Sequence, residues 1–210
     1  NMAIGMLPEI EKGVAVQLAK QTNTKWTSKT NNHSQISYHS LTLLNRAFLL
    51  YSNQFNSSKN NFYYFNYNLD NNLLGLDDAE HILKLDIFNS IIFAANGWHG
   101  MVPTNRKFYW NSLENYFEPI YYDGNVNIDE DPLYINLPYS DYLLEAIVEA
   151  EKMLGQVQID SFVKKLNFRG LHYDKIKIEG TLDKLKANLK KLTFKISSTD
   201  DDLISDNKNI

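Results

Sequence analysis

The chain contains no cysteine, which excludes disulfides, iron–sulfur clusters, thiolate zinc sites and a cysteine nucleophile. Basic residues are also few. The 21 Lys and Arg stand against 25 Asp and Glu, for a net charge of −4 and a pI of about 5.7. A general nucleic-acid binder needs a surplus of basic residues to displace counterions from phosphate. We therefore expect no nucleic-acid partner.

Long apolar runs are absent too. The longest stretch, residues 91–95, is far shorter than the roughly 20 residues needed to cross a bilayer. We expect no transmembrane segment. The first eight residues lack the basic start and long apolar centre of a signal peptide, so none is expected. The chain begins with Asn1 rather than Met, which leaves open that it is a fragment of a longer protein.

What is present is ordinary for a folded domain. Hydrophobic residues make up 43% and charged residues 22% of the 210 residues, which is typical of globular proteins. This length is enough for one domain with a sizeable core. We expect a single domain over residues 1–196 and a polar acidic tail, frayed at the end of the chain, over residues 197–210.

The clearest predicted element is a helix over residues 78–95. Asp77 and Glu80 form a capping box, in which an acidic N-cap and a Glu three residues later satisfy the first N–H groups of a helix. Apolar side chains then recur on one face. The pair Asn96-Gly97 is typical of a helix end. We expect this helix to lie at the core of the domain.

A β-hairpin is predicted next, from strands at residues 106–110 and 116–122 with a turn between them. Pro119 favours an edge position for the second strand. The remaining pattern predicts helices at residues 7–21, 36–51, 140–154, 160–170 and 181–192, a strand at 62–67, and loops at 23–34 and 53–61. Asp160 is expected to cap its helix. The fold class predicted is α+β and mainly helical.

Chemically useful groups concentrate between His99 and Asp123, where a loop and the hairpin follow the core helix. Protein kinases organise phosphoryl transfer in this order. A catalytic loop supplies a base and then an Asn, and a hairpin delivers an Asp; the Asn and the Asp share Mg²⁺. A carboxylate and an amide oxygen are the hard donors that Mg²⁺ prefers.

Residues 77–128 resemble the C-lobe core of the CotH family, atypical protein kinases of bacterial type first known from spore coats. The likeness lies in the apolar helix and in three motifs that follow it: NGWH at 96–99, NRKFYW at 105–110 and FEPIYYD at 117–123. It implies a kinase-like C-lobe with a hairpin at the active-site edge. It also implies ATP- and Mg²⁺-dependent phosphoryl transfer to a hydroxyl, on a protein acceptor, and association with a cell surface or spore coat.

The resemblance assigns roles residue by residue. Asn105 and Asp123 match the metal-binding Asn and Asp, and Arg106 is assigned to the nucleotide. The family's catalytic Asp is replaced here by the Trp98-His99-Gly100 element, so His99 is the candidate base. The chain has no Gly-x-Gly-x-x-Gly loop. Either an N-lobe precedes Asn1, or ATP is not bound in the usual way.

Structural interpretations stay open beside these roles. His99 is equally explained as a hydrogen-bonded residue after a helix, and Asn105 as a partner of loop backbone. Residues 123–124 are typical of a two-residue type I′ hairpin turn, which would make Asp123 a turn residue only. Arg106 would then form a structural ion pair with Glu118 across the hairpin.

Two other functions compete with the kinase interpretation. One is a non-catalytic binding or structural module that uses a kinase-like scaffold to recognise a protein or glycan. The other is a transferase or hydrolase of unrelated fold, in which Asp123 orients His99 as a base. No His spacing in the chain is typical of a zinc site. A run of lysines in the last helix predicts a solvated face, or else a contact with a membrane surface or an anionic partner: Lys184, Lys186, Lys190, Lys191 and Lys195.

Overall fold

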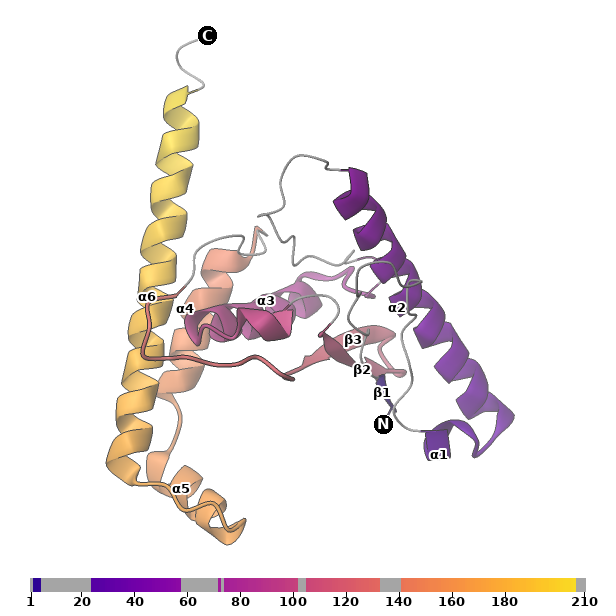
Figure 1. Ribbon diagram of the computed structural model, residues 1–210, viewed down its shortest axis with the longest axis horizontal. Coiled ribbons are helices and arrows are strands. Elements are labelled where there is room, and N and C mark those ends of the chain that lie inside the picture. Colours follow the sequence, from indigo (N-terminus) through magenta and orange to yellow (C-terminus); the bar gives the residue numbers. More distant parts are fainter. Residues whose placement is uncertain are drawn as a thin grey trace.

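The computed structural model describes residues 2–4, 24–57, 72, 74–101, 105–132 and 141–206 (Figure 1). They form a mainly helical α+β fold, as predicted. The helices are α1 (Thr24–Thr27), α2 (Asn31–Ser57), α3 (Ala79–Ala94), η1 (Trp98–Met101), α4 (Leu143–Gly155), α5 (Ile159–Phe168) and α6 (Lys175–Asp206). The strands β1 (Met2–Ile4), β2 (Lys107–Asn111) and β3 (Tyr116–Ile120) form one antiparallel sheet in the order β1-β2-β3.

Helix α3 lies between two hydrophobic cores. In Figure 1 it runs from the sheet and α2 on one side to α4 and α6 on the other. Leu85, in its first half, packs in the core shared with α2 and the sheet. Ile92 and Phe93, in its second half, pack in the core shared with η1, α4 and α6. The central helix that the sequence predicts is therefore the element that joins both halves of the fold.

The start of α3 corrects the predicted cap by one residue. Asp78, not Asp77, is the N-cap, with an extended backbone and a side-chain oxygen that accepts the His81 N–H at 2.8 Å. Glu80 does not close a capping box, because it pairs with Lys84 at 2.8 Å instead. Two successive Asp residues are equally good caps by composition, and the backbone geometry selects the second.

The end of α3 matches the prediction at Asn96-Gly97. Asn96 has a left-handed backbone, with φ of 53°. The Asn96 N–H bonds to the carbonyl of Phe93 at 2.9 Å, and the Gly97 N–H to that of Ile92 at 2.8 Å. This pair of bonds is a Schellman motif, which satisfies carbonyls that the helix leaves without partners.

The hairpin is also confirmed, with its turn at residues 112–115 and Trp110 opposite Phe117. Pro119 lies on β3 at the edge of the sheet, as expected. The alternative turn at 123–124 is wrong. Strand β3 ends at Ile120, and no strand follows it among residues 121–132. This segment returns to the end of α3 instead.

Several predicted boundaries are wrong, and others fall outside the described residues. The loops expected at 23–34 and 53–61 are partly helical, because α2 begins at Asn31 and ends at Ser57. At its start, the Thr30 hydroxyl accepts the His33 N–H at 3.3 Å. Asp160 lies in the first turn of α5, behind Gln158 at the N-cap. Helix α6 continues through residues 197–206, where fraying was expected. The expected helix at 7–21 and strand at 62–67 lie outside the described residues.

Residues 121–132 follow the hairpin and are called the returning segment below. Buried side-chain amides fix this segment to the end of α3. The Asn127 N–H donates to the carbonyl of Ala95 at 3.0 Å. Asn96, which is buried, places its amide nitrogen 3.0 to 3.1 Å from three carbonyl oxygens of this segment, those of Asn127, Glu130 and Asp131. One side chain thus serves both as the helix end and as the anchor of the returning chain.

Asn188 of α6 completes this attachment from the other side. It is also buried, and its amide nitrogen lies 2.9 Å from the carbonyl of Ala94 and 3.2 Å from that of Ile128. The first of these carbonyls belongs to the last turn of α3. Because a buried carbonyl without a donor is costly, Asn188 ties α3, the returning segment and α6 together.

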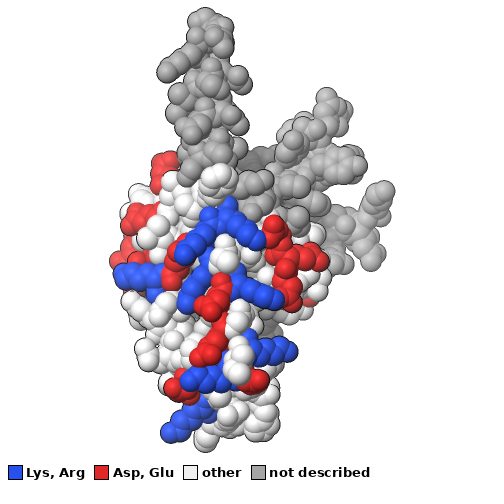
Figure 2. Space-filling view, turned by 90° about the vertical axis from the view of Figure 1, so that its left-hand side faces the viewer, with Lys and Arg blue, Asp and Glu red and all other residues white. Residues whose placement is uncertain are grey.

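Ion pairs on the surface also join α6 to the returning segment. Lys184 and Lys191 of α6 pair with Asp129 and Asp131 of the returning segment. Lys184 lowers the pKa of Asp129 through its hydrogen bond and its charge. Figure 2, which faces this side of the molecule, shows Lys and Arg interspersed with Asp and Glu. Lys184 and Lys191 thus belong to a surface of mixed charge. Among the described residues no helix is long and apolar enough to cross a bilayer.

We expect Asn188→Ala to lower the free energy of unfolding by about 1–3 kcal/mol, because it leaves buried carbonyls of α3 and the returning segment without a donor. Urea unfolding followed by circular dichroism measures this change. The matched control is Asn32→Ala, on the exposed surface of α2, which should change the stability by less than about 0.5 kcal/mol. Equal stability of the two variants would contradict the anchoring role.

Candidate functional site

Three of the predicted site residues meet at one place. His99 lies in η1, directly after the end of α3. Asn105 precedes β2, and Asp123 follows β3. Because β2 and β3 are antiparallel neighbours, with Lys107 opposite Ile120, the chain enters and leaves the hairpin at the same end. The attachment of residues 127–131 to α3 then holds this end beside η1.

The geometry of the cluster centres on one ring nitrogen. His99 Nε2 lies 2.9 Å from Asn105 Nδ2 and 3.7 Å from Asp123 Oδ2. The Asn105 amide also donates to the backbone carbonyl of His99 at 3.2 Å. Asn105 is buried, whereas 41% of the His99 side chain and 57% of the Asp123 side chain are exposed. The cluster therefore has a buried side at Asn105 and an open side at the imidazole and the carboxylate.

Two partners compete for this nitrogen. An unprotonated Nε2 accepts a hydrogen bond from Asn105, and a protonated imidazole is attracted by the charge of the Asp123 carboxylate, 3.7 Å from Nε2. Asn105 keeps a bond to the His99 carbonyl in either case. Histidine is the side chain best suited to exchange a proton near neutral pH. The arrangement can therefore accept a proton at Nε2 and stabilise the charge that forms with Asp123.

Glycine makes the close approach of the two backbones possible. A Cβ atom at Gly100 would lie 2.7 Å from the carbonyl oxygen of Tyr122 and 3.1 Å from the Cα of Gly124. Real Cβ atoms do not approach backbone so closely. Asp123 itself has φ of 47°, a left-handed conformation that Asp tolerates better than most residues. The distance between His99 and Asp123 thus depends on Gly100.

Arg106 does not join the cluster. Its guanidinium is buried, with Nε donating to the carbonyl of Met101 at 3.0 Å and Nη2 lying 3.4 Å from Asn89 Oδ1. Burial lowers the pKa of Arg106 to about 10, although the nearby charge of Asp86 opposes this shift. The expected ion pair with Glu118 is wrong, because Arg106 turns inward to η1 and α3. It positions the end of η1 rather than facing a ligand.

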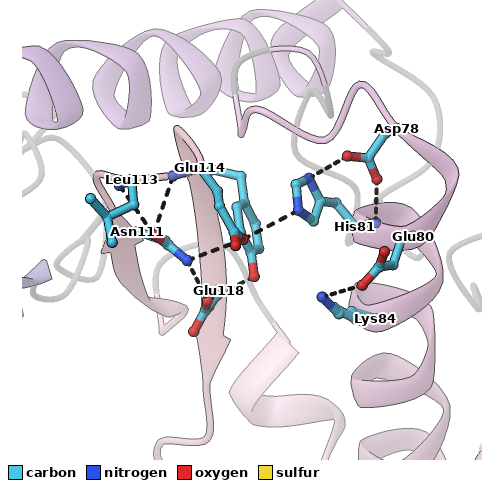
Figure 3. A network of polar contacts seen from close by, with 9 residues as sticks. Asp78, Glu80, His81, Lys84, Asn111, Leu113, Glu114 and Glu118 are labelled. Atoms are coloured by element: carbon cyan, nitrogen blue, oxygen red, sulfur yellow. Dashed lines mark hydrogen bonds and ion pairs between the residues drawn. The ribbon is translucent and has the colours of Figure 1, made fainter.

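A second polar cluster, which was not predicted from the sequence, lies at the other end of α3 (Figure 3). His81 stacks on Tyr116 of β3, with 3.7 Å between ring centroids. Its Nδ1 lies 3.0 Å from Asp78 Oδ2, in a contact not aligned as a hydrogen bond, and its Nε2 lies 3.6 Å from Glu114 Oε2. Glu114 is in the hairpin turn and Tyr116 on β3, so no local spacing in the sequence indicates their contacts with His81.

Neither cluster forms a familiar metal centre. Within the part of the chain that the structure describes, no three His, Asp or Glu side chains are grouped to hold a metal ion. Comparisons of the chain with protein families, curated proteins and solved structures found no match. The functional interpretation therefore rests on the chemistry of the residues themselves.

We expect Gly100→Ala to lower the free energy of unfolding by about 1–3 kcal/mol, the usual cost of an atom inserted into a packed site. The same change should separate His99 from Asp123. Gly180→Ala is the control, because no atom lies within 4 Å of its added Cβ, and it should raise the stability of α6 by about 0.5–1 kcal/mol. Unfolding in urea and histidine ring NMR signals measure both effects. An unchanged His99 signal in Gly100→Ala would contradict this account.

Proposed function

We propose that this chain transfers a phosphoryl group from Mg²⁺-bound ATP to a hydroxyl on a protein, at the cluster of His99, Asn105 and Asp123. The observation that carries the proposal is that an imidazole, an amide and a carboxylate from three separate segments meet around one ring nitrogen. These are the residues that the kinase-like resemblance assigns as base and metal ligands, and they lie next to one another.

The donor chemistry fits a hard divalent cation. Asn105 uses its Nδ2 for His99, and no described residue donates a hydrogen bond to its Oδ1. Asp123 Oδ2 faces His99, so Asp123 Oδ1 is the carboxylate oxygen available to a metal ion. Asn105 Oδ1 and Asp123 Oδ1 would hold Mg²⁺, since carboxylate and amide oxygens are its preferred protein ligands. When bound there, Mg²⁺ would neutralise negative charge on the phosphates of ATP.

The protein's own contribution to the reaction is proton transfer and orientation. His99 Nε2 would accept the proton of the acceptor hydroxyl after the Asn105 amide releases it, because this nitrogen has a single lone pair. The Asp123 carboxylate, 3.7 Å from the same nitrogen, stabilises the imidazolium that results through its opposite charge. Asn105 fixes the ring through Nε2 before this step and keeps its bond to the His99 carbonyl afterwards.

A non-catalytic binding module is the second candidate. The burial of Arg106 removes the cation assigned to the nucleotide, and this observation favours recognition over catalysis. Apolar side chains at the end of β3 and in the segment after it are also well exposed near Asp123 in the chain, namely Ile120, Tyr121 and Val126. In this alternative His99 and Asp123 form polar contacts to a protein or glycan partner, and the apolar residues surround those contacts.

Calorimetry with Mg²⁺-ATP tests the proposed function. Wild-type protein should bind ATP only in the presence of Mg²⁺, and Asp123→Ala should weaken binding by about tenfold or more, as loss of metal-site residues commonly does. Asp77→Ala, an exposed Asp next to the cap of α3, is the control and should bind like the wild type. His99→Ala should retain binding and lose phosphoryl transfer.

The outcomes separate the candidates. Binding that needs no Mg²⁺, or that both Asp variants weaken equally, would contradict the metal assignment. If wild-type protein does not bind Mg²⁺-ATP at all, the phosphoryl-transfer proposal fails for this chain, and the binding module is favoured.

A further inference from the structure

A pocket lies between α3 and β3, at the opposite end of α3 from His99. Its volume is about 430 Å³, within the range of small-molecule sites, which run from about 300 to 1,000 Å³. Its apolar lining comes from Leu85, Phe88, Phe117 and Pro119, and its polar lining from His81, Lys84, Tyr116 and Glu118. In Figure 3, Glu118 of β3 lies beside Asn111, and Lys84 of α3 lies beside Glu80.

Most of the charges around this pocket are already matched. Lys84 pairs with Glu80, with Nζ 2.8 Å from Oε1, and this contact raises the pKa of Lys84. The ring nitrogens of His81 face the carboxylates of Asp78 and Glu114. Each positively charged or ionisable nitrogen at the pocket thus has an acidic partner of its own, so neither Lys84 nor His81 is left to attract an anion.

Glu118 has only neutral partners. Its Oε1 accepts the Tyr116 hydroxyl at 2.7 Å and the Asn111 amide at 3.1 Å. Burial and the bond to Glu118 both raise the pKa of Tyr116, so the phenol stays protonated and acts as donor. No described residue donates to Glu118 Oε2 or forms an ion pair with this carboxylate. Glu118 therefore presents an uncompensated negative charge beside an apolar surface.

We propose that the pocket binds a small organic cation, a primary amine carried on an apolar or aromatic body. The ammonium group lies at Glu118 Oε2, and the body packs on Leu85, Phe88, Phe117 and Pro119. A charged group is held most strongly where its partner is partly desolvated and fixed by other hydrogen bonds, which describes Glu118. This site does not depend on the phosphoryl-transfer proposal, because it uses none of the same residues.

Calorimetry with two probes of similar shape and opposite charge tests the site in the wild-type chain. Phenethylamine should bind with saturation, and phenylacetate should bind at least about tenfold more weakly, since a like charge at a partly buried carboxylate is strongly disfavoured. NMR signals of the Tyr116 and His81 rings should shift with phenethylamine. Absence of saturable phenethylamine binding, or equal binding of both probes, would overturn the proposal.

A variant then identifies the recognising group. Glu118→Gln keeps an oxygen for Tyr116 and removes the charge, and should weaken phenethylamine about tenfold or more. Glu145→Gln, an exposed Glu on α4 outside the pocket, is the control and should bind like the wild type. Unchanged affinity in Glu118→Gln, with the fold verified by circular dichroism, would overturn the assignment. The two-probe comparison needs no variant, so it decides the proposal even if Glu118→Gln does not fold.

Discussion

The fold depends on hydrogen bonds from two buried asparagine side chains at the end of α3. Asn96 holds the carbonyls of the segment that returns from the hairpin, and Asn188 joins that segment to the last turn of α3 and to α6. A backbone segment at a buried helix end needs donors for its carbonyls, and these amides supply them. Together with the bond from the Asn127 N–H to Ala95, they bring Asp123 back beside His99.

This attachment gives α3 a double role. Its two halves belong to different hydrophobic cores, and a polar cluster lies at each end. At its start, the Asp78 cap also faces the ring of His81, beside the pocket closed by β3. At its end, the Schellman motif leads into η1 and the cluster of His99. The hydrogen bonds that complete the two ends of α3 thus also position His81 at its start and His99 after its end.

Local signals allowed part of this structure to be predicted from the sequence. The core helix, its end at Asn96-Gly97, the hairpin and the edge position of Pro119 all follow from short-range rules of periodicity and backbone conformation. The order of His99, Asn105 and Asp123 indicated that they would meet. The burial of Arg106 was not predicted, because it follows from the packing of η1 on α3. The contacts of His81 with Glu114 and Tyr116 were missed because these residues are distant in the chain. The same holds for Asn188, which bonds to a carbonyl 94 residues before it.

Amide hydrogen exchange at Asn127 measures the central claim most directly, since this N–H bonds to Ala95 only if the returning segment is fixed to α3. The account predicts protection comparable to that of the Gly97 amide, which bonds within the Schellman motif, because both open only when the end of α3 is disrupted. Exchange of Asn127 at the rate of an exposed amide, with Gly97 still protected, would contradict it and leave Asp123 without a fixed place beside His99.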